Sequence, residues 1–272
     1  MRSFKEEIYE NLSDYRERTL KIPEMGYWKN KPYGHILPKD KKKENIFPEY
    51  QKSFFNSELG RIKLHLYFHH LNSSQAMCIN FFYPIFTENK LDLITNYLGF
   101  KDEVIDYNSV RFEKESDIDK KNNRRPTNFD FYFKTKSGKN FFFEIKYTES
   151  DFGKAKNDLD HHDKFLKVYC QHLPKVVQIK YTEMTVFLKH YQIVRNLIHI
   201  NESSYVVFLY PKKNTAVNKA AHFAEENILN KDKLPHLFNI TWEDIILNLK
   251  SNPNVNSDFL GEFKKKYFVN LI

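Results

Sequence analysis

Two aromatic-rich segments separated by a short turn constrain this chain more than any other feature. Residues 129–133 read Phe-Asp-Phe-Tyr-Phe, and residues 141–147 read Phe-Phe-Phe-Glu-Ile-Lys-Tyr. Ser137 and Gly138 lie between them, and a Ser-Gly turn between two such runs is typical of an antiparallel β-hairpin. Residues 109–115 alternate polar and apolar side chains just before this hairpin, which predicts a third strand beside it.

The hairpin also carries charged side chains at positions that its geometry should bring together. Side chains of a strand alternate between its two faces, so Asp130 lies on the face opposite the phenylalanines of its strand. Glu144 and Lys146 are two residues apart and therefore share a face. A turn near Gly138 brings Asp130 close to Glu144. The sequence thus predicts two carboxylates and an ammonium group on one side of a strand pair.

Such a group of side chains is suited to metal-assisted chemistry on a phosphate. Two carboxylates stay ionised at close range only with a cation between them, and their oxygens suit Mg²⁺ or Mn²⁺. The metal can lower the pKa of a bound water and stabilise charge on a phosphoryl oxygen. Lys146 could orient or deprotonate that water, or stabilise the charge of the transition state. The simpler interpretation is an ordinary pair of solvent-exposed charges, although polar residues that interrupt aromatic strands are costly unless paired or useful.

The charge of the chain permits a polyanionic partner. The 272 residues include 43 Lys and Arg against 35 Asp and Glu, a net charge of +8. Arg195, in a later helical segment, is a candidate nucleic-acid contact or simply a helix-surface residue. Lysine runs at 41–43 and 264–266 are expected to be solvated. Four basic residues just before Asp130 are candidates to bind nucleic-acid phosphates: Lys120, Lys121, Arg124 and Arg125.

The remaining segments predict a mixed α/β (α+β) fold. Residues 204–210 are apolar and end at Pro211, which predicts a buried strand, and residues 240–242 could form a short one. The order of helix, three strands, helices, strand and helix is that of a sheet flanked by helices. Helical periodicity extends over residues 51–70, 75–82, 89–98, 184–198 and 214–229.

Cysteine content and hydropathy favour a soluble cytoplasmic protein. Cys78 and Cys170 are too few for a disulfide framework and suit a reducing compartment. The charged N-terminus lacks the apolar region of a secretory signal, and no apolar run approaches the roughly 20 residues of a membrane span. We therefore expect no membrane partner.

Four segments in order resemble a known group of enzymes. Pro-Thr-Asn-Phe-Asp at 126–130 and Phe-Glu-Ile-Lys-Tyr-Thr-Glu at 143–149 resemble the PD-(D/E)XK nuclease superfamily, and more narrowly its restriction-endonuclease-like bacterial proteins. Residues 73–84 are similar to the first core helix of that group, and residues 192–197 to a later helix. The resemblance extends over residues 73–211.

The resemblance implies a restriction-endonuclease-like core with a small mixed four-stranded β-sheet flanked by α-helices, and Mg²⁺-dependent hydrolysis of DNA. We expect residues 73–272 to form the nuclease domain that the resemblance implies. The pattern of the preceding residues predicts that residues 1–72 form a helical and extended N-terminal cover. Asp130 and Glu144 would be metal ligands, and Lys146 the catalytic lysine.

The auxiliary residues of the site and the assembly state stay open at this point. Glu113 could be a further ligand or a solvated strand charge, and Gln75 stands where the group often has an acidic residue. Gln192, in the later helix, is a third auxiliary candidate. A homodimer would allow both DNA strands to be cut. Two alternatives are a catalytically inactive nuclease-fold protein that binds DNA, and an unrelated α+β protein in which these side chains do not converge.

Overall fold

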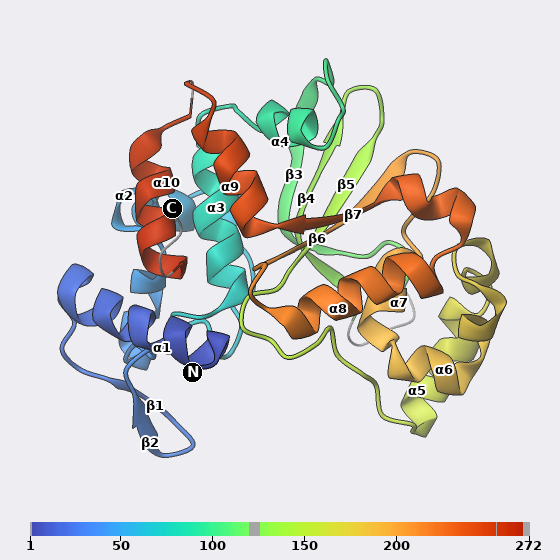
Figure 1. The fold of residues 1–272 in the computed structure, drawn as a ribbon, viewed down its shortest axis with the longest axis horizontal. Helices are drawn as coiled ribbons and strands as arrows, with labels where there is room; N and C mark the ends of the chain where they lie inside the picture. The colour runs from blue at the N-terminus through green and yellow to red at the C-terminus, as the bar shows by residue number, and fades with distance from the viewer. Residues whose placement is uncertain (1, 120–125, 254, 269–272) are drawn as a thin grey trace. The chain divides into compact units, whose positions relative to one another are not determined.

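The computed structural model describes residues 2–119, 126–253 and 255–268 (Figure 1). The chain forms two compact units. The first unit consists of Met1–Asp102 with Trp242–Ile272, and the second consists of Glu103–Thr241. These units differ from the segments 1–72 and 73–272, and that division stays a prediction from the sequence.

A mixed five-stranded sheet forms the centre of the second unit. The strands β3–β4 and β4–β5 pair antiparallel, whereas β5–β6 and β6–β7 pair parallel. The expected mixed sheet flanked by helices is confirmed, and the short strand suggested near residue 240 raises the number of strands from four to five. In spatial order the strands are β3 (Ile105–Glu115), β4 (Asn128–Thr135), β5 (Asn140–Ile145), β6 (Ser204–Tyr210) and β7 (Leu237–Thr241).

The hairpin of β4 and β5 forms as its aromatic pattern predicts. Phe131 pairs with Phe143 and Phe133 with Phe141, and the rings of both pairs are in contact across the strands. Gly138 supports the turn with φ +94°, a left-handed conformation that glycine adopts without steric cost.

Phe129 differs from the expectation that it shares a face with Phe131. Its ring instead contacts the rings of Phe142 and His199, each at a centroid distance of 4.8 Å. The alternation of faces therefore breaks between Phe129 and Phe131. The β3–β4 pairs on either side of Asp130 bracket Glu113 of β3, which has φ +52°. Such a left-handed residue is irregular for a strand, and it lies beside the position at which the faces change.

Helices of the long β5–β6 connection and of the β6–β7 connection cover one face of the sheet (Figure 1). Val206, Phe208 and Tyr210 of β6 belong to the core beneath them. The helical segment predicted at 184–198 is interrupted at His190, whose φ of −115° is not helical. The helices are α5 (Leu159–Lys164), α6 (Met184–Lys189), α7 (Tyr191–Leu197) and α8 (Thr215–Phe223).

The first unit is built around α3 (Ser74–Thr87), which is buried from Gln75 to Ile85. Phe81 contacts Trp242 and Phe263 of the C-terminal helices, so the two ends of the chain share one core. Pro84 lies within α3. The other elements are α1 (Phe4–Asp14), β1 (Gly26–Trp28), β2 (Lys31–Tyr33), α2 (Pro48–Asn56), α4 (Asp92–Tyr97), α9 (Trp242–Lys250) and α10 (Ser257–Tyr267).

Membrane-spanning length is not reached anywhere in the described ranges: none of their helices is both long and apolar enough to cross a bilayer.

Candidate active site

Asp130 lies where β4 and β5 stop pairing through their backbones. The described ladder ends at the pair of Phe131 and Phe143, and the next backbone N–H, that of Ile145, donates to Asp130 Oδ2 at 2.6 Å. The carboxylate thus takes the place of a ladder carbonyl. This bond fixes the Asp130 side chain against the end of β5, close to Glu144.

Glu144 and Lys146 form a buried ion pair at the end of β5. Lys146 Nζ donates to Glu144 Oε1 at 2.7 Å. The Lys146 side chain is 8% exposed and the Glu144 side chain 4%. Gln192 of α7 donates from Nε2 to the same Oε1, also at 2.7 Å. The backbone N–H of Lys146 donates to the carbonyl oxygen of Leu209 in β6, which continues the parallel ladder. One carboxylate oxygen therefore accepts from both Lys146 and Gln192.

Negative charge is concentrated around Asp130. Burial raises the pKa of Asp130 well above its usual value, and the charges of Glu144 and Glu113 raise it further. Burial alone would lower the pKa of Lys146, but Glu144 and Glu149 raise it above the ordinary lysine value. These carboxylates carry more charge than the Lys146 ammonium compensates, and an added cation would relieve the repulsion.

The donor set at this position consists of two carboxylates. In the part of the chain that the structure describes, no group of three or more His, Cys, Asp and Glu side chains is arranged to hold a metal ion. Glu113 acts on Asp130 through its charge without completing such a group. Two carboxylates with water and a phosphate are a sufficient set for Mg²⁺, which usually keeps several waters.

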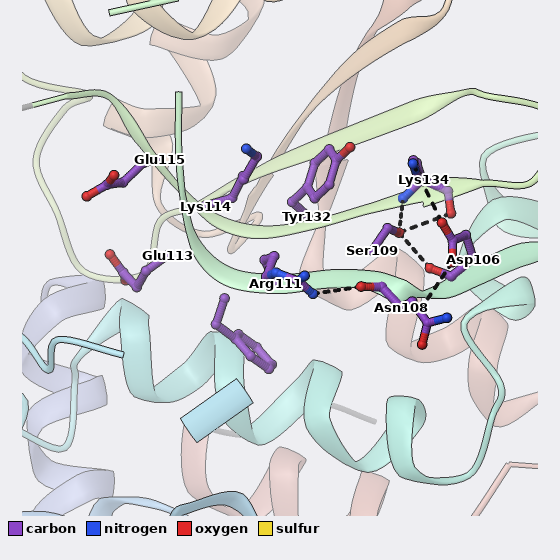
Figure 2. A pocket seen from close by; sticks show the side chains of 10 residues that line it. Asp106, Asn108, Ser109, Arg111, Glu113, Lys114, Glu115, Tyr132 and Lys134 are labelled. Carbon is purple, nitrogen blue, oxygen red and sulfur yellow. Dashed lines mark hydrogen bonds and ion pairs between the residues drawn. The ribbon is translucent and has the colours of Figure 1, made fainter. Parts of the chain in front are cut away.

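Glu113 lies instead in an open groove along β3, the edge strand of the sheet. The groove has a volume of about 650 Å³. Figure 2 shows Glu113 and Glu115 at one end of the groove, with Lys134 and Asp106 at the other. Arg111 and Tyr132 lie between these ends. Cations and carboxylates are mixed along the groove, so its charge favours no single kind of ligand.

Gln75, another auxiliary candidate, belongs to the first unit. Its side chain is buried in α3, where Oε1 accepts from the backbone N–H of His65 at 2.8 Å and Nε2 donates to the Lys63 carbonyl oxygen at 3.2 Å. These bonds tie α3 to the segment that precedes it. They give Gln75 a structural task within its own unit.

Arg195 contributes to a buried network that no pattern in the sequence indicates. Its Nη2 lies 3.1 Å from Asp119 Oδ2, and Tyr169 donates its hydroxyl to the same oxygen at 2.8 Å. The backbone N–H of Thr127 donates to both oxygens of Asp119 at 3.0 Å. Asp119 and Thr127 flank the four basic residues predicted to bind phosphates, which lie outside the described residues: Lys120, Lys121, Arg124 and Arg125.

No periodicity or motif marks Asp119 in the sequence. Its partners Tyr169 and Arg195 are 50 and 76 residues away along the chain. Only its place at the start of a polar loop, just before a segment that resembles a family motif, could have drawn attention to it. Lys164, whose Nζ lies 4.0 Å from Asp119 Oδ2, was missed for the same reason.

A mixed sheet flanked by helices, with Asp130, Glu144 and Lys146 grouped at the ends of adjacent strands, has the architecture of a restriction-endonuclease-like protein. The comparison with protein families gives the particular group. A family model described as "Restriction Endonuclease associating with ARP" (REase-ARP) matches residues 10–268, and the chain belongs to this family. No curated protein and no solved structure matches the chain.

Proposed function

We propose that this protein is an endonuclease that hydrolyses DNA phosphodiester bonds with the help of Mg²⁺ or Mn²⁺. The observation that carries the proposal is the approach of three side chains. Asp130 is fixed to the backbone of Ile145, and Lys146 is bonded to Glu144 at 2.7 Å. Membership of a restriction-endonuclease family supports DNA as the substrate.

The residues at this position fit a divalent cation. Glu144 is a buried oxygen donor and Asp130 a partly exposed one. Loss of hydration and then the charge of Glu144 raise the pKa of Asp130, and carboxylate oxygens are the ligands that Mg²⁺ and Mn²⁺ prefer. Both carboxylates are the residues that would hold the metal. When bound, it would supply an acidic water and charge stabilisation at a phosphoryl oxygen.

The remaining side chains have tasks that follow from their contacts. Lys146 presents an ammonium group beside Glu144, where it can donate to the attacking water or to a phosphate oxygen. Gln192 of α7 donates to the same Glu144 oxygen as Lys146 and so orients that carboxylate. Glu113 increases the negative charge at Asp130 and so strengthens its preference for a cation.

A plasmid nicking assay tests the proposal. Wild type is expected to nick supercoiled DNA with Mg²⁺ or Mn²⁺ and to lose this activity in EDTA. Lys146→Ala and Glu144→Gln are expected to reduce nicking by about 100-fold or more, since a single preorganised group that stabilises developing charge has an effect of this size.

Lys139→Ala is the matched control for Lys146→Ala. Lys139 lies in the same hairpin and pairs with Glu103, but it is at the turn rather than at the strand ends that carry the site. Nicking that persists in EDTA and in both site variants would contradict the mechanism. DNA binding without nicking under any metal would favour the alternative, a catalytically inactive nuclease-fold protein.

A homodimer is the proposed assembly for cutting both strands of a duplex. Sedimentation of the protein with and without DNA tests this, and a monomer under both conditions would refute it.

A further inference from the structure

The β1–β2 hairpin of the first unit combines exposed aromatic rings with a high density of lysine. Tyr27 is 62% exposed, Trp28 38% and Met25 45%. Residues 21–43, which contain the hairpin, carry seven lysines against two carboxylates, a net charge of +5 in a chain whose total is +8. More than half of the net positive charge of the chain therefore lies within these 23 residues.

Hydrogen bonds at both ends attach the hairpin to the rest of its unit. Arg16 is 3% exposed, and its guanidinium donates to the carbonyl oxygens of Gly34 at 2.7 Å and Glu24 at 3.2 Å, one on each side of the hairpin. Gly26 donates to the Ile36 carbonyl oxygen at 2.7 Å, and a Cβ at Gly26 would lie only 2.1 Å from the Leu37 carbonyl oxygen. These contacts attach both ends of the hairpin to neighbouring segments of its unit.

The tip of the hairpin has a conformation that places a lysine next to the rings. Lys29 and Asn30 form the two-residue turn with φ of +47° and +62°, a pattern that suits hairpins but that lysine rarely adopts. Lys29 Nζ lies 4.6 Å from the centre of the Trp28 ring. Figure 1 shows the hairpin projecting from the helices of its unit.

A hollow of about 750 Å³ lies against the Tyr27 side of the hairpin. Tyr27 and Met25 line it together with Lys29 and Lys39. Two carboxylates also line it: Glu24, which is paired with Lys41 at 3.3 Å, and Asp40, so three lysines face two carboxylates. A flat ring beside lysines is the arrangement that receives a stacked base with its phosphates, because every base has a π-face and the backbone is anionic. Paired bases within a duplex expose only their edges to such a ring.

We propose that the β1–β2 hairpin binds an unpaired stretch of DNA, with a base stacked on Tyr27 and phosphates on Lys29 and Lys39. This inference takes DNA as the ligand from the proposed function. Binding at the hairpin needs neither metal nor hydrolysis. It can therefore be measured in EDTA, where the proposed metal-dependent cleavage does not take place.

Tryptophan fluorescence gives a direct readout. The chain has two tryptophans, of which Trp28 is exposed and Trp242 is fully buried. Titration with a short oligothymidylate in EDTA is expected to quench Trp28 emission, and Trp28→Phe is expected to remove this change. A duplex of the same length is expected to bind the hairpin more weakly than the single strand.

Variants separate stacking from charge. Tyr27→Ala is expected to weaken single-strand binding by about ten-fold, whereas Tyr27→Phe, which keeps the ring, retains it. Tyr67→Ala, which removes another exposed tyrosine of the same unit (51% exposed), serves as the control. Lys29→Ala with Lys39→Ala is expected to reduce the slope of log K against log salt by about 0.7 for each phosphate that the protein no longer neutralises.

The binding and nicking measurements together test the hairpin site. Unchanged binding by Tyr27→Ala, or equal binding of duplex and single strand, would overturn it. Quenching by phosphatidylserine-containing vesicles without quenching by DNA would also overturn it, in favour of a membrane surface. Quenching by DNA together with no nicking under any metal would leave the hairpin site standing and refute the proposed function.

Discussion

Replacement of Asp119 by Asn tests whether the buried network around Arg195 stabilises the second unit through charge. The Asp119 side chain is 1% exposed and accepts hydrogen bonds from Thr127 and Tyr169, with Arg195 Nη2 at 3.1 Å. Burial alone would raise the pKa of this carboxyl. The hydrogen bonds from Tyr169 and Thr127 and the charge of Arg195 outweigh burial and lower the pKa to about 2.

The contribution of Asp119 to the free energy of unfolding follows from the difference between its pKa in the folded and in the unfolded state. A fall from 3.8 to about 2 corresponds to about 2 kcal/mol of unfolding free energy at pH 7. Because the folded pKa is depressed, this contribution is complete above the unfolded pKa and is lost as the pH falls towards the folded one. About 1 kcal/mol of it should be gone by pH 3.

Urea unfolding of wild type and Asp119→Asn between pH 7 and pH 3 measures the effect. The variant is expected to be less stable by about 2 kcal/mol or more at pH 7, since Arg195 is then left without its buried carboxylate. The gap should narrow as the pH falls. Asp117→Asn, at a carboxylate whose side chain is 80% exposed, is the control and should change stability by less than about 0.5 kcal/mol. Equal stability of Asp119→Asn and wild type, or a gap independent of pH, would refute the reasoning.

Three further substitutions test the site and the two cores. Gln192→Ala should lower the nicking rate while leaving the urea midpoint nearly unchanged, because it removes a donor to Glu144 from the site; an unaltered rate would exclude an orienting role. Phe131→Ala should destabilise the second unit by about 3–5 kcal/mol, since its ring is fully buried against Phe143, and a loss below about 1 kcal/mol in urea unfolding would show a poorly packed hairpin. Burial lowers the pKa of Lys266 well below its usual value, so the folded state binds fewer protons than the unfolded state. Wild type should therefore gain stability relative to Lys266→Met as the pH rises from 7 towards 10. Parallel curves of unfolding free energy against pH for the two proteins would contradict this.

The hairpin that carries the candidate site could be predicted because its signals are local. Side-chain alternation and one Ser-Gly turn determine the pairs Phe131–Phe143 and Phe133–Phe141. The same register leads directly to the approach of Asp130 and Glu144. Such information lies within about twenty residues of sequence, where period and turn type decide the geometry.

The parts that could not be predicted depend on contacts distant in sequence or on an irregular backbone. Phe129 lies on the opposite face from Phe131, close to Glu113. The left-handed φ of Glu113 could not be predicted, because the residue is a glutamate and not the glycine or asparagine that usually adopts this conformation. Asp119 meets Arg195 across 76 residues. The packing of Phe81 on Trp242 and Phe263, which joins the C-terminal helices to the first unit, is likewise invisible to local periodicity.

A comparison of Lys266 with Lys146, both buried, shows why burial by itself does not identify a catalytic group. Lys266 donates to the backbone and side-chain oxygens of Asn45 and lies beside the aromatic rings of Tyr15 and Tyr267, so burial dominates and its pKa falls. Lys146 is equally enclosed, but Glu144 and further carboxylates surround it and its pKa rises. Lys266 has neutral partners that satisfy it within the fold. Lys146 belongs to a group in which carboxylates outnumber cations, and this imbalance favours an added cation beside Lys146 and not beside Lys266.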